Sequence, residues 1–171
     1  MRCRINKQKL VFALFDALID NEPAVRHLER PELATVVREC LYHFAGERYD
    51  LLSYVVMPSH FHWVFHPRTE WVQRQTSDEK RTPRERIMQS IKGYSANQCN
   101  GLLGFHGEFW QDESYDHVVR NDEEMWRIIE YIEQNPVKAK LVINPQDWRW
   151  SSAYDRRKHN LRPGEPLIVK A

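Results

Sequence analysis

Two histidines separated by one residue, His60 and His62, lie in the bulky segment YVVMPSHFHWVFHP at residues 54–67. The surrounding aromatic and β-branched residues predict a strand, and side chains two apart on a strand share a face. The two positions would then lie about 6–7 Å apart, so both imidazoles can bind one cation. The alternative is a half-exposed strand whose polar face carries histidines without a ligand.

Two imidazoles do not complete a metal site, and the familiar histidine signatures do not supply the rest. Position 64 holds valine, which excludes a histidine triad. The chain has neither a second His-x-Ser/Thr, as a two-histidine phosphoesterase requires, nor an HExxH motif. A third ligand must therefore come from another part of the chain.

The segment YIEQNP offers a candidate, because Tyr131 and Asn135 are four residues apart and share a face of a helix. An amide oxygen is an acceptable ligand for Mg²⁺ or Mn²⁺, and a phenol one turn away can attack an electrophile held by that metal. Gln134, at i+3 spacing, is the second choice of ligand. Alternatively, Tyr131 packs in an apolar stripe and Asn135 only ends the helix before Pro136.

The elements that must position these residues follow from periodicity and from capping and turn residues. The expected strands are residues 48–57, 60–66 and 114–120, the first two forming a hairpin around Pro58-Ser59. The expected helices are residues 10–19, from Pro31 to about residue 44, from about Pro83 to Asn100, and from the Asn121 cap to Pro136. Residues 68–82 read as a loop, and the end of the chain from residue 147 reads as a basic, mobile tail.

Composition restricts the class of protein but not its partner. A chain of 171 residues with 42% hydrophobic and 29% charged residues is a globular protein, most simply one domain. The net charge of +1 neither demands nor excludes nucleic acid. Cys3, Cys40 and Cys99 are odd in number and widely spaced, which favours reduced thiols. The basic, apolar start resembles a secretory signal, but Asp16 interrupts it; we expect a cytoplasmic protein without membrane partners.

The motifs together carry a resemblance to a known family. Over roughly residues 48–154 the chain contains Met-Pro-x-His-x-His, then Phe-Trp followed by Asp-His-x-x-Arg, then Tyr-Ile-x-x-Asn-Pro-Val-Lys-Ala. In this order they resemble the REP-associated tyrosine transposases, relatives of the single-tyrosine HUH transposases, where U is a hydrophobic residue between two histidines. The resemblance implies a metal-dependent enzyme that nicks and rejoins single-stranded or hairpin DNA through a 5′-phosphotyrosine intermediate.

The resemblance also assigns roles to residues and a fold to the chain. It implies that Tyr131 is the nucleophile and that His60, His62 and Asn135 bind Mg²⁺ or Mn²⁺. The expected fold is α+β: a ferredoxin-like antiparallel sheet with helices on one face and the HUH strand facing the catalytic C-terminal helix. Tyr115, on the strand before that helix, is the rival nucleophile.

The chain departs from the family pattern in two places. Ser59 stands where the family commonly has Asn, and nothing before residue 30 reads like the family's opening strand, HVTFR. Residues 1–47 are therefore expected to be a divergent helical region, and 155–171 a basic tail, within one domain of residues 1–171. A missing first strand would leave a sheet edge uncovered and favours the alternative of an inactive or domesticated hairpin-binding protein.

Basic residues near the expected site are candidates for contacts with phosphate. Lys92, Arg120 and Lys138 are the first choices, with Arg84 and Arg86 further along, and the alternative for each is ordinary solvated surface. A third function, a phosphodiesterase that uses water, would give hydrolysed DNA and no protein adduct. The sequence leaves open a monomer or a homodimer.

Overall fold

The computed structural model describes residues 11–16, 26–75, 81–111 and 115–168. Its centre is a four-stranded antiparallel sheet in the order β2-β3-β1-β4. The strands are β1 (Val11–Asp16), β2 (Tyr49–Val56), β3 (His60–Pro67) and β4 (Tyr115–Val118). The helices are α1 (Pro31–His43), α2 (Thr69–Gln73), α3 (Pro83–Leu103), α4 (Asp122–Lys138) and α5 (Ser152–His159), with short 3-10 turns at His27–Glu29 and Pro145–Asp147. The expected α+β, ferredoxin-like class is confirmed.

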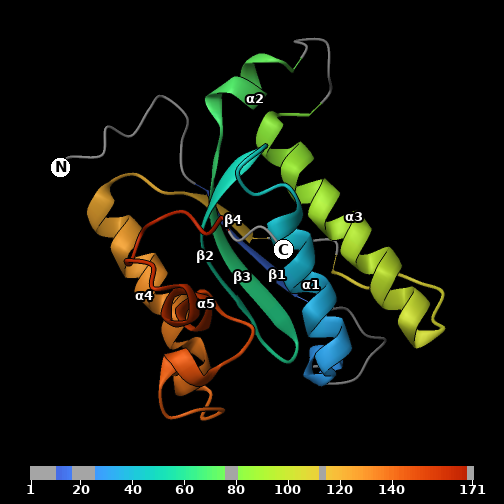
Figure 1. Ribbon diagram of the computed structural model, residues 1–171. Coiled ribbons are helices and arrows are strands. Elements are labelled where there is room, and N and C mark those ends of the chain that lie inside the picture. Colours follow the sequence, from blue (N-terminus) through green and yellow to red (C-terminus); the bar gives the residue numbers. More distant parts are fainter. Residues whose placement is uncertain (1–10, 17–25, 76–80, 112–114, 169–171) are drawn as a thin grey trace.

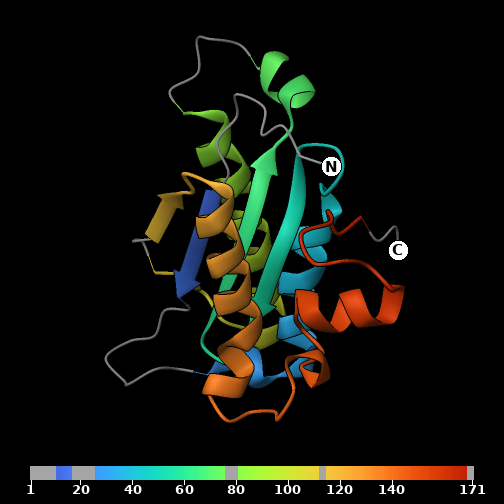
Figure 2. The same cartoon turned by 90° about the vertical axis from the view of Figure 1, so that its left-hand side faces the viewer.

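Helices cover both faces of this sheet, so the expectation of helices on one face is wrong. Figure 1 shows α1 and α3 on one side and α4 with α5 on the other, and Figure 2 shows α4 in front of the strands. The physical reason lies in β3, because side chains on both of its faces are buried. Phe61, Trp63 and Phe65 pack in the core beneath α1 and α3, whereas Val64 packs in a second core with α4.

A bulge in β2 changes which face of the sheet its side chains point to, so that the strand contributes residues to both cores. The pairing between β2 and β3 shifts between Leu51 and Ser53, which leaves Leu52 as the extra residue. Beyond the bulge Tyr54 is opposite Trp63, and these two residues belong to the core beneath α1 and α3. Leu52 belongs to the other core, beneath α4.

The segment Val11–Asp16 is a strand, so the helix expected over residues 10–19 is wrong there. The strand β1 pairs with β3 on one side and with β4 on the other, with Leu14 opposite His62. A run such as VFALF suits a buried strand or a helix face, and sheet pairing on both sides decides between them. The opening strand that looked absent is therefore present beside the histidine strand, and that edge is covered. The remaining residues of the expected helix, 10 and 17–19, lie outside the described residues.

Two segments expected to be irregular are helical. Thr69–Gln73 forms α2 inside the expected loop, and Ser152–His159 forms α5 inside the expected mobile tail. Ser151 caps α5 by accepting a hydrogen bond from the Tyr154 N–H. Neither residue 155 nor residue 156 is part of a loose basic end, because Asp155 and Arg156 are both buried. No helix among the described residues is long and apolar enough to span a membrane.

The buried Arg156 joins three elements. Its Nε donates to Glu133 Oε1 of α4 at 3.2 Å, and its Nη2 donates to the carbonyl oxygen of Leu52, the bulge residue of β2. Its Nη1 donates to the carbonyl oxygens of Arg162 and Glu165 in the chain end. A buried guanidinium that satisfies these acceptors holds α5, α4 and the bulge in one arrangement.

We predict that Arg156→Ala lowers the free energy of unfolding by about 3–5 kcal/mol, because it leaves the partly buried Glu133 carboxylate without its positive partner and three carbonyl oxygens without their donor. Urea unfolding followed by circular dichroism measures this change. The neighbouring Arg157→Ala is the matched control, because Arg157 makes an exposed ion pair with Asp147 and its loss should cost little. Equal effects of the two substitutions would contradict the structural role of Arg156.

Candidate functional site

The expected histidine pair lies on one face of β3, in the middle of the sheet. The ring centroids of His60 and His62 are 4.9 Å apart and the rings are nearly perpendicular. His62 is 4% exposed, whereas His60 is half-buried at the start of the strand. The opposite face of β3 is fixed by the packed rings of Phe61, Trp63 and Phe65. The imidazoles are thus held on a rigid element, as a metal or substrate site requires.

Tyr131 of α4 lies against this pair. Its ring centroid is 5.6 Å from that of His62, at an angle of 77°. The neighbouring Ile132 is fully buried and Ile128 packs beside the same core, but Tyr131 itself is 43% exposed. The reading of Tyr131 as an ordinary core residue is therefore wrong. The Tyr131 side chain is thus partly exposed while its ring contacts His62.

Asn135 lies one helical turn after Tyr131, inside α4. Its Nδ2 donates to the Tyr131 carbonyl oxygen at 2.8 Å, so Oδ1 is the atom that a cation would use. The expected end of the helix at Pro136 is wrong, because α4 continues to Lys138 with the proline inside it. The helix continues there because backbone N–H groups of Ala139 and Leu141 still bond to the carbonyls of Asn135 and Pro136.

Lys138 brings a positive charge to the same place. Its Nζ lies 4.8 Å from the centroid of the Tyr131 ring, a cation–π distance. Of the three basic residues expected near the site, Lys138 is the one for which a contact with Tyr131 is seen among the described residues. Its position suits a phosphate held beside the phenol.

The electrostatic environment keeps His62 neutral at physiological pH. Burial and, to a smaller extent, the neighbouring His60 together lower the pKa of His62 to about 3. A neutral imidazole is the form that binds a metal ion. The Nδ1 atom of His60 is 3.0 Å from Ser59 Oγ. If Nδ1–H donates to the hydroxyl, the lone pair of His60 lies on Nε2, as a metal ligand requires.

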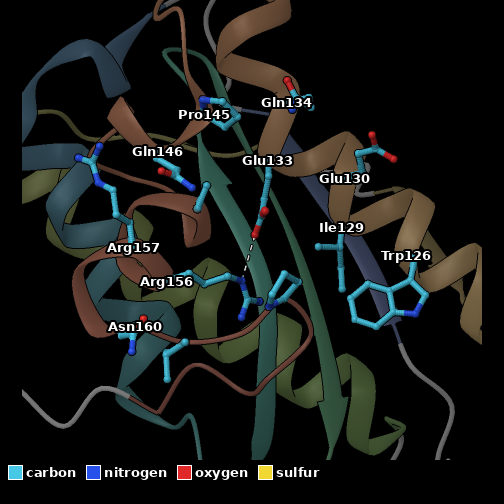
Figure 3. Close-up of a pocket in the computed structure, with 13 residues that line it drawn as sticks. Trp126, Ile129, Glu130, Glu133, Gln134, Pro145, Gln146, Arg156, Arg157 and Asn160 are labelled. Carbon is cyan, nitrogen blue, oxygen red and sulfur yellow. Dashed lines mark hydrogen bonds and ion pairs between the residues drawn. The ribbon is translucent and has the colours of Figure 1, made fainter.

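The side chains near Tyr131 fit a hard divalent cation only if the amide oxygen of Asn135 is counted as a ligand together with the two histidines. In the part of the chain that the structure describes, no three His, Cys, Asp or Glu side chains cluster as a metal site. His60 and His62 together with the amide oxygen of Asn135 would give three ligands. Gln134, the second choice, lines a cavity of about 580 Å³ between α4 and α5 (Figure 3), and Tyr131 is not part of that lining.

Two basic candidates lie away from Tyr131. Lys92 is on α3, across the sheet from α4, and its Nζ donates to the carbonyl oxygen of Gln111. Arg120 precedes the N-cap of α4, roughly 16 Å along the helix from Tyr131. Binding of DNA by either residue stays a prediction. The rival Tyr115 is in register with Leu14, two strands away from His62.

A link between β4 and α4 was not anticipated from the sequence. His117 Nε2 lies 2.9 Å from Glu124 Oε1, and Glu124 Oε2 accepts the backbone N–H of Arg120. This contact ties the start of the tyrosine helix to the edge strand. Both residues lie close to the Asn121 cap in the sequence. Sequence spacing alone does not show that their side chains meet, because one lies on a strand and the other on a helix.

Comparisons with known proteins bear on the family resemblance and on the fold. No family model matches the chain. A REP-associated tyrosine transposase of Escherichia coli (strain K12) is 25% identical over 115 residues, which cover 67% of this chain and 61% of that protein. A putative REP-associated tyrosine transposase of Haemophilus influenzae is 33% identical over 54 residues, 32% of this chain and 31% of that protein. The matches thus span less than two thirds of either relative.

A solved structure extends the comparison to the fold. A REP-associated tyrosine transposase bound to a REP hairpin superposes with a TM-score of 0.63 at 18% identity, covering 100% of this chain and 93% of that one. The predicted resemblance to REP-associated tyrosine transposases is confirmed. At this identity the superposition shows a shared fold between the chain and that transposase, and the roles of individual residues stay predictions.

The low pKa of His62 gives a prediction about stability. In the unfolded chain this histidine takes up a proton below about pH 6.5, whereas in the folded protein it stays neutral until about pH 3. Stability should therefore fall as the pH is lowered through this window, by about 2 kcal/mol between pH 6.5 and 4.5.

Urea unfolding in the presence of a chelator measures this effect, with His62→Leu as the control that removes the titrating group. As the pH falls, the free energy of unfolding of the wild type should decrease more than that of His62→Leu. Parallel stability curves for the two proteins would show that His62 is not held neutral by burial.

Proposed function

We propose that this chain is a tyrosine transposase that nicks and rejoins single-stranded, REP-like hairpin DNA with the help of a divalent metal ion. The proposal is carried by the contact of the Tyr131 ring with the buried His62, whose neighbour on the same face is His60. The names of the sequence relatives and the hairpin in the solved transposase supply the class of substrate. In this proposal the protein acts in the cytoplasm, as a monomer or a homodimer.

In this proposal His60, His62 and Asn135 hold Mg²⁺ or Mn²⁺. The ion would polarise the scissile phosphate and neutralise negative charge that develops in the transition state. The neutral state of His62 keeps a lone pair available at neutral pH without competition from a proton. The position of Asn135 on the same helix as Tyr131 would fix ligand and nucleophile relative to each other.

Tyr131 is the proposed nucleophile. Its hydroxyl oxygen forms a bond to phosphorus and loses its proton, while the bond from phosphorus to the 3′ oxygen breaks and that oxygen takes up a proton. The products are a 5′-phosphotyrosine and a free 3′-hydroxyl. Lys138, beside the Tyr131 ring, would hold the phosphate. Because the covalent bond keeps the phosphodiester linkage, a 3′-hydroxyl can attack it and rejoin the strand without ATP.

Two alternative functions make different products. A binding-only protein would retain the hairpin and leave it intact. The apparent lack of a first strand favoured this alternative, and β1 now occupies that place beside β3. A phosphodiesterase that activates water would cut the strand and form no covalent adduct.

We expect Tyr131→Phe to abolish both cleavage and the covalent adduct, by about 10³-fold or more, because it removes the attacking oxygen and keeps the ring. The measurement is incubation of the protein with labelled single-stranded REP-like hairpins and Mn²⁺, followed by a denaturing gel. Hairpin binding and the free energy of unfolding should persist, since the ring that contacts His62 is kept and the residue is exposed.

Tyr115→Phe is the matched control and should cleave normally. If Tyr115→Phe is inactive and Tyr131→Phe is active, the nucleophile has been assigned to the wrong residue. If neither substitution matters and the DNA is still cut, water is the attacking group. If the wild type binds hairpins and never cuts them, the binding-only function holds.

Removal of the metal ligands should separate chemistry from hairpin binding. His60→Ala and His62→Ala are each expected to reduce cleavage by more than about 100-fold. Mn²⁺ binding, followed by isothermal titration calorimetry, should be lost as well, while hairpin affinity is largely kept. Asn135→Ala should have a weaker effect that raised Mn²⁺ partly rescues, and Gln134→Ala should have none. Equal loss of cleavage and hairpin binding in the histidine variants would point to a structural role instead.

A further inference from the structure

Two exposed aromatic rings lie together on the helical layer across the sheet from Tyr131. Tyr94 of α3 is 62% exposed, and its ring is nearly parallel to that of His43, the last residue of α1, with centroids 6.5 Å apart. Phe44 packs edge-on against His43 with ring centroids 4.3 Å apart, and the guanidinium of Arg48 lies 3.3 Å from the centroid of Phe44. Figure 1 shows α1 and α3 side by side in this layer.

A pocket of about 400 Å³ lies further along the same helix. It surrounds the C-terminal end of α3 and is lined by Asn97, Asn100 and Phe105, among others. Phe105 is 42% exposed and lies over Gly107, where a Cβ atom would meet its ring at 2.8 Å. The amide nitrogen of Asn100 donates to the Gly107 carbonyl oxygen, whereas its buried Oδ1 has no donor among the described residues. The pocket thus combines an aromatic face with amide groups.

The helix that carries Tyr94 has little negative charge. The helix α3 has no Asp or Glu from Arg86 to Leu103, and Lys92 precedes Tyr94 by two residues. The pocket is lined by no acidic residue. The nearest carboxylates in the sequence are Glu39 and Glu47, four residues before and after His43, and Glu108, just after the pocket. Exposed aromatic rings on a surface with few acidic groups are what proteins use to bind single strands, because every base has a face that stacks.

We propose that this aromatic surface, formed by His43, Tyr94, Asn97 and Phe105, binds unpaired nucleotides of single-stranded DNA outside the catalytic site. One base stacks on Tyr94 and His43, and another enters the pocket beside Phe105, where the amide of Asn97 meets its polar edge. Gly101 lines the pocket and lies seven residues after Tyr94, about 10 Å along the helix. One DNA strand can therefore reach both the Tyr94 ring and the pocket. The identity of the ligand as DNA rests on the proposed function.

The test is the binding of fluorescein-labelled oligothymidylate of twenty nucleotides, measured by fluorescence anisotropy at fixed salt. Tyr94→Ala should weaken binding about 5- to 150-fold, as the loss of one stacked base does. Tyr94→Phe keeps the ring and should bind like the wild type. Trp126→Ala removes an exposed aromatic ring from α4 and is the control for location; it should leave the affinity unchanged.

Each outcome decides the proposal. Wild-type affinity in Tyr94→Ala, or equal loss in Trp126→Ala, would overturn it, as would the absence of any oligothymidylate binding to the wild type. Failure of the proposed function is seen separately, because the adduct assay depends on Tyr131 and the anisotropy assay does not. If Tyr131→Phe cleaves normally while Tyr94→Ala loses the single strand, the aromatic surface stands and the nucleophile is misassigned.

Discussion

The burial of β3 on both faces is the constraint on which the rest of the structure depends. Side chains alternate along a strand, so the residues that pack beneath α1 and α3 also fix the direction of His60 and His62 on the other face. Phe61, Trp63 and Phe65 are fully buried. A shift of one residue in the pairing of β3 would turn these rings toward α4 and the histidines into the aromatic core. The same packing therefore stabilises the fold and aims the histidines.

The position of Tyr131 also requires that α4 is held at a fixed position along β3. Its buried residue Ile132 packs on the sheet, and Glu133 is bound by the buried Arg156, which also holds the bulge of β2. At the other end, Glu124 contacts His117 of β4. Tyr131 lies between these contacts, so its distance from His62 is set by packing and charge together. Elements with no part in the chemistry thus position the phenol.

The sequence predicted the parts whose signals are local. Alternation and turn residues revealed β2, β3 and β4, and helical spacing with the Asn121 cap revealed α4 with Tyr131 and Asn135 on one face. The strand β1 was misread because an apolar run without polar alternation fits a helix equally well, and only pairing with two neighbours decides it. The burial of Asp155 and Arg156 in α5 was equally hidden, because their partners lie on α1, β2 and α4.

Burial of His62 has opposite effects on stability and on metal binding. Burial of the imidazole lowers its pKa, so between about pH 3 and pH 6.5 the unfolded chain binds a proton that the folded protein does not. The free energy of unfolding therefore decreases as the pH falls. The same loss of the proton leaves the imidazole ready to bind a cation at neutral pH. A more exposed histidine would stabilise the protein better in mild acid and would bind protons in competition with a metal. The buried position therefore favours the proposed metal binding and lowers stability in acid.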